Sequence, residues 1–144
     1  MGRALRGTTY EDYGISKQRY FELKAICRQY REMKQRIGYG LTAVKSDGMP
    51  HGYGVSQPTE RAALRNLGLL CRIQMIEVAA ERATKGMIRP IYHGLMLNVT
   101  DGISYFDLNI PMGSTDFYAV KRLFFHYLDE LEQDTRKGLN NVDD

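Results

Sequence analysis

The chain has 144 residues, with 43% hydrophobic and 26% charged side chains and a formal net charge of +3. These values are ordinary for a globular protein of one domain, or of one domain with a helical extension. No apolar run is long enough to span a bilayer, and the first ten residues lack the apolar core of a secretory signal. We therefore expect a cytoplasmic protein without membrane contact.

Residues 1–14 are polar and aperiodic, which predicts a flexible or loosely docked N-terminal arm. Ser16 is a good N-cap, and apolar residues then recur at helical spacing, which predicts one helix over about 17–37 that Gly38 and Gly40 end. This helix and its cap (16–37) carry seven basic and two acidic groups, a net charge of +5. Five of the basic side chains are candidate phosphate contacts: Lys17, Arg19, Lys24, Arg28 and Arg31.

Residues 38–57 contain five glycines and a proline, which predicts a Gly-rich loop rather than a regular helix. A loop of this length usually has a function of its own or changes conformation. Pro58 suits the first turn of a second helix. The apolar stripe of this helix is broad, so we expect it to pack on more than one neighbour until it ends near residue 86. Residues 15–86 thus form a helical N-terminal part.

Residues 87–137 form a second predicted part, built from shorter helices with clear start and stop signals. The predicted order is a helix from Pro90 to Gly102, a short helix over 104–108 and a turn over 109–113. A long helix that Ser114 caps then runs to about residue 135, and a disordered tail follows over 138–144. The predicted fold is therefore all-α, with about five helices, the long N-terminal ones packed with a C-terminal helix-turn-helix.

The short helix, the tight turn and the long helix form the arrangement with which many proteins read DNA. The short helix holds the long one at an angle that lets its first turns enter the major groove, where small polar residues leave room for base edges. The recognition helix, 114–132, begins with such residues and carries basic groups that can bind phosphate or guanine. The candidate DNA-binding residues lie broadly on one side of it: Ser114, Thr115, Asp116, Tyr118, Lys121 and Arg122.

Other observations favour a different function for the same part of the chain. Two helices joined by a short turn are a common scaffold in all-α proteins. Residues 87–137 carry five basic against seven acidic groups, whereas DNA readers usually present a basic face. Asp116 is equally a helix-start residue that the helix dipole favours. The alternative is a non-enzymatic protein-interaction module that binds a host polymerase, a packaging component or a defence protein.

Three stretches together resemble the ArpU-like and RinA-like transcriptional activators of Firmicutes phages and prophages. They are YEDYGISKQRYFELKAICRQYREMKQRI, GMPHGYGVSQPTERAALR and NVTDGISYFDLNIPMGSTDFYAVKRLFFHYLDE, and they span about residues 10–130. The last stretch is similar to the DNA-reading part of sigma factors. The resemblance implies an all-α, non-enzymatic protein that binds DNA near phage late or packaging genes, with Ser114 to Arg122 on its recognition helix.

Catalytic and metal-binding patterns are weak in this sequence. The histidines His51, His93 and His126 have no His or Cys partner at ligand spacing. The glycines of 38–54 do not match a phosphate-binding loop, and no nucleophile–base grouping is evident. We therefore expect no enzyme, no metal and no cofactor, and we interpret Cys27 and Cys71 as small core residues.

These observations predict a sequence-specific DNA-binding transcriptional regulator of phage or prophage type, acting in the cytoplasm of a bacterial host cell. Its expected partner is double-stranded DNA, with RNA polymerase or another protein as a further partner. A homodimer is expected, because one short recognition helix gives limited specificity by itself.

Overall fold

Across residues 9–47 and 59–143, the part of the chain that the computed structural model describes, there are six helices and no strand. Side chains are described for residues 9–38 and 61–138. The helices are α2 (Lys17–Arg28), α3 (Tyr30–Asp47), α5 (Thr59–Ala83), α6 (Arg89–Asp101), α7 (Tyr105–Leu108) and α8 (Ser114–Asp143). The predicted all-α fold is confirmed. Within these ranges, none of the helices has the length and apolar character that a bilayer crossing requires.

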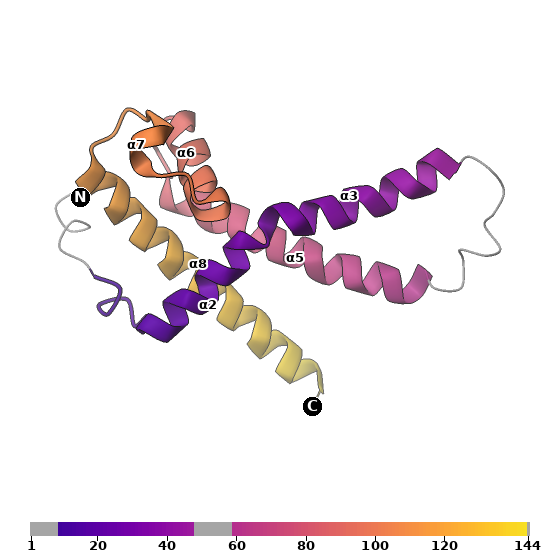
Figure 1. Ribbon diagram of the computed structural model, residues 1–144. Coiled ribbons are helices and arrows are strands. Elements are labelled where there is room, and N and C mark those ends of the chain that lie inside the picture. Colours follow the sequence, from indigo (N-terminus) through magenta and orange to yellow (C-terminus); the bar gives the residue numbers. More distant parts are fainter. Residues whose placement is uncertain (1–8, 48–58, 144) are drawn as a thin grey trace.

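The predicted single helix over 17–37 is wrong, because the chain breaks at Gln29 into α2 and α3. Ser16 caps α2 as expected, its hydroxyl accepting a hydrogen bond from the Arg19 amide at 3.1 Å. At the other end, the Gln29 amide bonds to the Ile26 carbonyl at 3.1 Å, which tightens the last turn. α2 lies against α6 and α8, whereas α3 lies mainly along α5. The break lets each half follow its own neighbour (Figure 1).

α3 continues through the first half of the stretch that was expected to be a Gly-rich loop, 38–57. Gly38 and Gly40 therefore lie inside a helix, where glycine costs about 1 kcal/mol relative to alanine. Packing of α3 along the antiparallel α5 offsets this cost, and the two helices form an arm that leaves the body of the molecule (Figure 1). The rest of the predicted loop, with Pro58, lies outside the described residues.

Helices α6 and α7 begin and end where their local signals predict. α6 has Pro90 in its first turn and ends at Gly102, whose φ of 75° is in the left-handed region that favours glycine. Ser104 caps α7, its hydroxyl accepting a hydrogen bond from the Asp107 amide at 3.4 Å. α8 starts at Ser114, which is thus the first helical residue rather than the cap.

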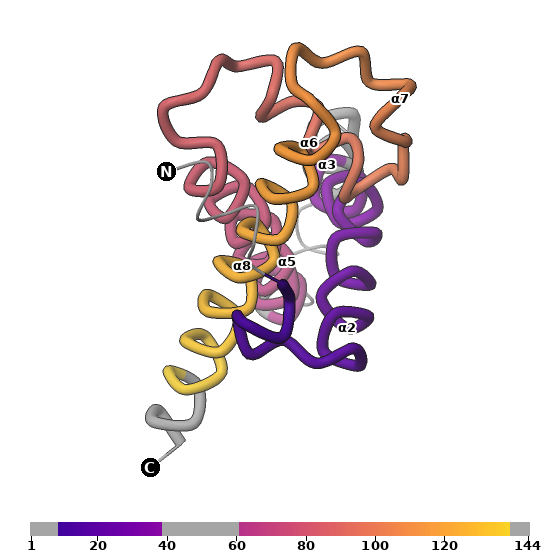
Figure 2. The backbone as a smooth tube through the Cα atoms, turned by 90° about the vertical axis from the view of Figure 1, so that its left-hand side faces the viewer, coloured from indigo at the N-terminus to yellow at the C-terminus, as the bar shows by residue number. Residues whose placement is uncertain are grey.

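α8 runs on to Asp143, so the predicted disordered tail over 138–144 is wrong up to that residue. The stretch contains no proline, and once a helix is nucleated each added residue costs little. The C-terminal half of α8 leads away from α6 and α7 (Figure 2).

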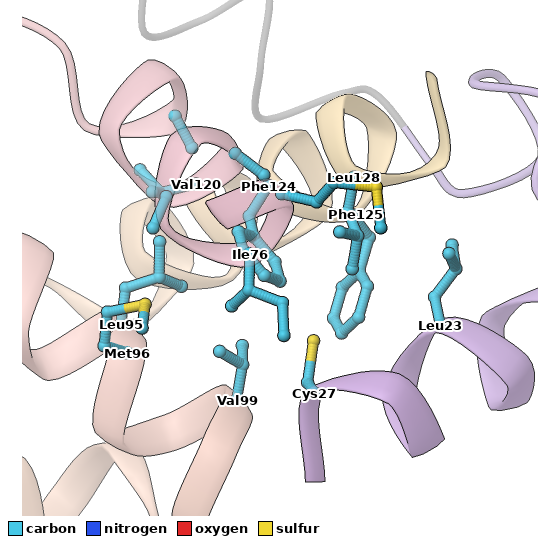
Figure 3. Packing of buried hydrophobic residues seen from close by; sticks show 14 of the residues in the cluster. Leu23, Cys27, Ile76, Leu95, Met96, Val99, Val120, Phe124, Phe125 and Leu128 are labelled. Atoms are coloured by element: carbon cyan, nitrogen blue, oxygen red, sulfur yellow. The ribbon is translucent and has the colours of Figure 1, made fainter. Parts of the chain in front are cut away.

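The core lies where α5 crosses α8, with α2 and α6 packed beside the crossing (Figure 3). Phe117, Phe124 and Phe125 of α8 are fully buried there. Cys27 belongs to this core as expected. Cys71, in contrast, is exposed on α5, which corrects its interpretation as a core residue. In the described part of the chain, this side of the first half of α5 is left uncovered.

The described end of the expected flexible arm, residues 9–14, forms a turn docked on the core. The Thr9 amide donates to the Asp12 carboxylate at 2.9 Å, which closes the turn. The Tyr10 ring then lies 4.9 Å from the Tyr20 ring, centroid to centroid. Aromatic packing thus holds this segment against α2 and α8.

Candidate nucleic-acid interface

The turn between α7 and α8 is fixed by contacts on both of its sides. The Tyr105 hydroxyl donates a hydrogen bond to the Met112 carbonyl, and the Tyr105 ring lies 5.4 Å from the Phe117 ring. On the side of α6, a Cβ added to Gly94 would approach Ile110 Cγ2 to 2.6 Å. The turn therefore packs directly on the α6 backbone, and this contact sets where α8 begins.

The first turns of α8 are open on one side. Ser114 and Thr115 are exposed, and Tyr118 one turn later is 42% exposed. We call these three residues the reading turn. Asp116 is only half-buried, whereas Phe117 on the opposite side is fully buried against α7 and the core. The apolar side of α8 thus anchors the helix and leaves the reading turn accessible.

Lys121, two turns further along α8, is directed toward α2. It lines a small hollow together with Lys24, Arg28 and Asn98. Burial lowers the pKa of Lys121, and the charges of Lys24 and Arg28 lower it further. We call Lys24, Arg28 and Lys121 the basic cluster. Among the described side chains, none of the three forms an ion pair.

Arg28 reaches its place in the basic cluster because α6 ends in a glycine. Its guanidinium lies over Gly102, where an added Cβ would come within 2.6 Å of Arg28 Nη1. The same glycine supplies the positive φ that the helix end requires. One residue therefore both terminates α6 and makes room for a cation.

Arg122 is half-buried on the other side of α8, close enough to Tyr10 for its charge to act on that phenol. Its Nε is buried and has no hydrogen-bond partner among the residues that the structure describes. The six candidate DNA-binding residues are thus divided by the fold. Ser114, Thr115 and Tyr118 share the open start of α8, Asp116 lies beside them, and Lys121 and Arg122 diverge toward different neighbours.

One candidate phosphate contact, Arg19, is already paired with carboxylates of the protein itself. Its side chain is only 14% exposed and pairs with Asp129 at 2.6 Å and with Glu132 at 2.5 Å. Burial alone would lower the pKa of the guanidinium, but hydrogen bonds to these carboxylates and to Glu22 raise it above its ordinary value. Arg19 therefore joins α2 to α8. Its charge is neutralised inside the protein.

The other four candidate phosphate contacts keep an accessible charge to different degrees. Lys17 is exposed at the start of α2, and Lys24 and Arg28 belong to the basic cluster. Arg31 is exposed but pairs with Asp101 at the end of α6. The α2 side of the interface therefore rests on the basic cluster, with Lys17 nearby on the same helix.

Sequence reasoning missed Asn98, a polar residue on the apolar side of α6. Its amide nitrogen donates to the Ile103 carbonyl at 2.9 Å, which holds the chain leaving α6. Its Oδ1 is buried without a hydrogen-bond partner in the described part of the chain, and the residue lines the hollow of the basic cluster. An asparagine within an apolar helical stripe was the available signal, because buried amides are costly unless they hold something in place.

Comparison with protein-family models, with curated proteins and with solved structures finds no match for this chain. In the part of the chain that the structure describes, no group of three or more His, Cys, Asp or Glu side chains gathers as a metal site would.

Proposed function

We propose that this protein is a sequence-specific DNA-binding transcriptional regulator of phage or prophage type, which reads the major groove with the start of α8. The observation that carries the proposal is the accessible reading turn together with the basic cluster. Lys121 of this cluster lies two turns further along α8, about 10 Å away, and Lys24 and Arg28 join it from α2. Small hydroxyl side chains at the reading turn suit base edges, and cations beside them suit the flanking phosphates.

The energetics of the basic cluster support this proposal. A lysine that is half-buried beside two further cations destabilises the folded protein, because its charge is desolvated and repelled. A phosphate of the DNA backbone relieves both effects when it binds. Shifted pKa values with a specific charge partner are frequent at functional sites.

The test is an electrophoretic shift of the full chain with duplex DNA from around its gene and with an unrelated duplex of equal length. We expect binding to both at low salt and a preference for the first at higher salt. Replacing Lys24 and Arg28 by alanine should reduce the slope of log affinity against log salt by about 2, because two phosphate contacts are lost. The matched control is the exposed pair Lys34 and Arg36 of α3, whose replacement by alanine should leave the slope unchanged.

Replacing Ser114 and Thr115 by valine tests the reading turn itself. We expect the preference for the specific duplex to be lost while affinity for the unrelated duplex is kept, because base contacts carry specificity and phosphate contacts do not. We further propose that two copies bind one site, which sedimentation of the complex with DNA measures directly.

A second function is favoured by one observation, the acidic balance of residues 87–137, with five basic and seven acidic groups. In that case the helix-turn-helix is a scaffold, and the protein binds another protein such as a polymerase, a packaging component or a defence protein. The two functions separate at low salt, where phosphate attraction is strongest. Absence of any duplex shift there would refute DNA binding and favour the protein partner.

A further inference from the structure

The first half of α5 carries an exposed apolar stripe far from the start of α8. Leu64 is 68% exposed and Leu67 is 62% exposed, and Gly68 and exposed Cys71 lie on the same face because the spacing is helical. We call these four residues the α5 stripe. A Cβ added to Gly68 would meet no atom of the described residues within 4 Å, so their side chains leave space above this face.

The stripe forms one wall of a groove between α5 and the last part of α8. The groove has a volume of about 520 Å³, and Met75 and Thr135 line it where the two helices converge. From that crossing the two helices diverge, α5 into the arm and α8 toward the C-terminus (Figure 1). The lining residues of the groove on α5 extend from Leu64 to Met75, about three helical turns, which is long enough for an elongated segment.

The stretch of α5 that carries the stripe is positively charged. Between Arg61 and Arg72, α5 carries three arginines and no acidic residue. The three, Arg61, Arg65 and Arg72, lie along one flank of the stripe, because they are four and seven residues apart. None of them forms an ion pair with another described side chain.

The wall that α8 contributes adds no free negative charge. Glu132 lines the groove, but it already binds Arg19 at 2.5 Å and Arg136 at 2.6 Å. An apolar floor beside a cationic flank is complementary to an amphipathic helix whose apolar side is bordered by carboxylates.

A second copy of this chain is a poorer occupant. Two α5 stripes packed antiparallel about Gly68 would bring Arg65 of one copy close to Arg72 of the other at both ends of the contact. Like charges at such an interface oppose association. The charge pattern therefore favours a partner of opposite sign over self-association.

We propose that the α5 stripe and its arginine flank bind an acidic amphipathic helix of another protein. The bound helix places apolar anchors at i, i+3, i+4 and i+7 over the stripe and its carboxylates beside Arg65 and Arg72. This surface acts independently of the reading turn, so the protein binds DNA with one face and a protein partner with the other.

The test uses the full chain and two designed 18-residue helical peptides with identical leucine anchors, one flanked by glutamates and the other by lysines. Fluorescence anisotropy should show that the glutamate peptide binds at least tenfold more tightly. Leu67→Glu should weaken that binding at least tenfold, and Arg65→Glu with Arg72→Glu should reverse the preference between the peptides. Leu97→Glu, at an exposed leucine of α6, is the matched control and should change nothing.

Three outcomes would overturn the proposal. Equal binding of both peptides, or of neither, shows that the flank does not select by charge. A concentration-dependent dimer that Leu67→Glu abolishes assigns the stripe to a second copy. Loss of duplex DNA binding in the Arg65→Glu/Arg72→Glu variant assigns the flank to nucleic acid. Because both leucines of the α5 stripe are exposed, the melting temperatures of Leu67→Glu and of the arginine variant should match that of the parent chain.

Discussion

Replacing Arg19 by methionine should destabilise the protein severely, because Arg19 joins α2 to α8 from a nearly buried position. The guanidinium is 14% exposed, and its carboxylate partners Asp129 and Glu132 are 9% and 11% exposed. Removing one partner of a buried ion pair typically costs 3–5 kcal/mol, since the remaining charge stays desolvated. Here Glu132 keeps Arg136 and Asp129 keeps Gln133, so we expect the lower end, about 3 kcal/mol.

Urea unfolding measures this change directly, and the loss should appear as a shift of the midpoint with an unchanged slope. A loss of about 3 kcal/mol corresponds to a fall in the melting temperature on the order of 10 °C for a chain of this size. Lys17→Met is the matched control, because Lys17 is exposed on the same helix and its replacement should stay within about 0.5 kcal/mol.

The triple replacement of Arg19 by methionine and of Asp129 and Glu132 by leucine should recover most of the stability, because no buried charge is then left unpaired. A loss under about 1 kcal/mol in the single variant, or a triple variant no better than the single one, would refute this reasoning. Under conditions where Arg19→Met is folded, its DNA affinity should stay within about twofold of the parent chain, because Arg19 contacts no phosphate. A larger selective loss would return Arg19 to the phosphate contacts.

Three further predictions concern the interface and its support. Lys121→Met should raise the free energy of unfolding, because burial lowers the pKa of the lysine and disfavours its charged form. The same replacement should weaken duplex binding. Urea unfolding and gel shift measure the two effects, and a variant with lower stability as well as weaker binding contradicts the expectation. Gly94→Ala should lower the free energy of unfolding by about 1–3 kcal/mol, because the new methyl group would clash with Ile110 Cγ2. Gly113→Ala should be tolerated, because a Cβ there meets no atom of the described residues within 4 Å. Equal urea midpoints for the two variants would argue against the contact. Burial raises the pKa of Tyr10 above its ordinary value of 10.0. The neutral phenol therefore stabilises the fold fully below pH 10, and this stabilisation is lost as the pH rises further. Tyr10→Phe should make the fall of the urea midpoint at alkaline pH shallower, and an unchanged fall would exclude Tyr10 ionisation as its cause.

The elements with strong local signals were predictable, and those set by distant contacts were not. Pro90 and Gly102 bound α6 because each acts through its own backbone geometry. The break at Gln29 has no such signal, since no glycine or proline stands there; it follows from α2 and α3 packing on different helices. Gly38 and Gly40 wrongly predicted a helix end for a related reason. α3 continues through both glycines because it packs along α5.

The interface shows the same division between local and distant causes. Ser104 signals the start of a short helix through its own capping geometry, and the polar residues at 114 and 115 are exposed as their type suggests. The burial of Lys121 depends on where α2 crosses α8, which spacing along one helix does not reveal. Arg19 differs from its neighbouring cations only through carboxylates 110 and 113 residues away in the sequence.

α8 is one uninterrupted helix from Ser114 to Asp143, and Thr135 in the α5–α8 groove lies on it about 30 Å from Ser114. That span is close to a single turn of the double helix, about 34 Å. If α8 binds DNA and the groove binds a protein as proposed, one continuous helix separates the two sites by about this distance. Because α8 has no break between these two sites, the helix itself would fix the distance between the bound DNA and the bound protein.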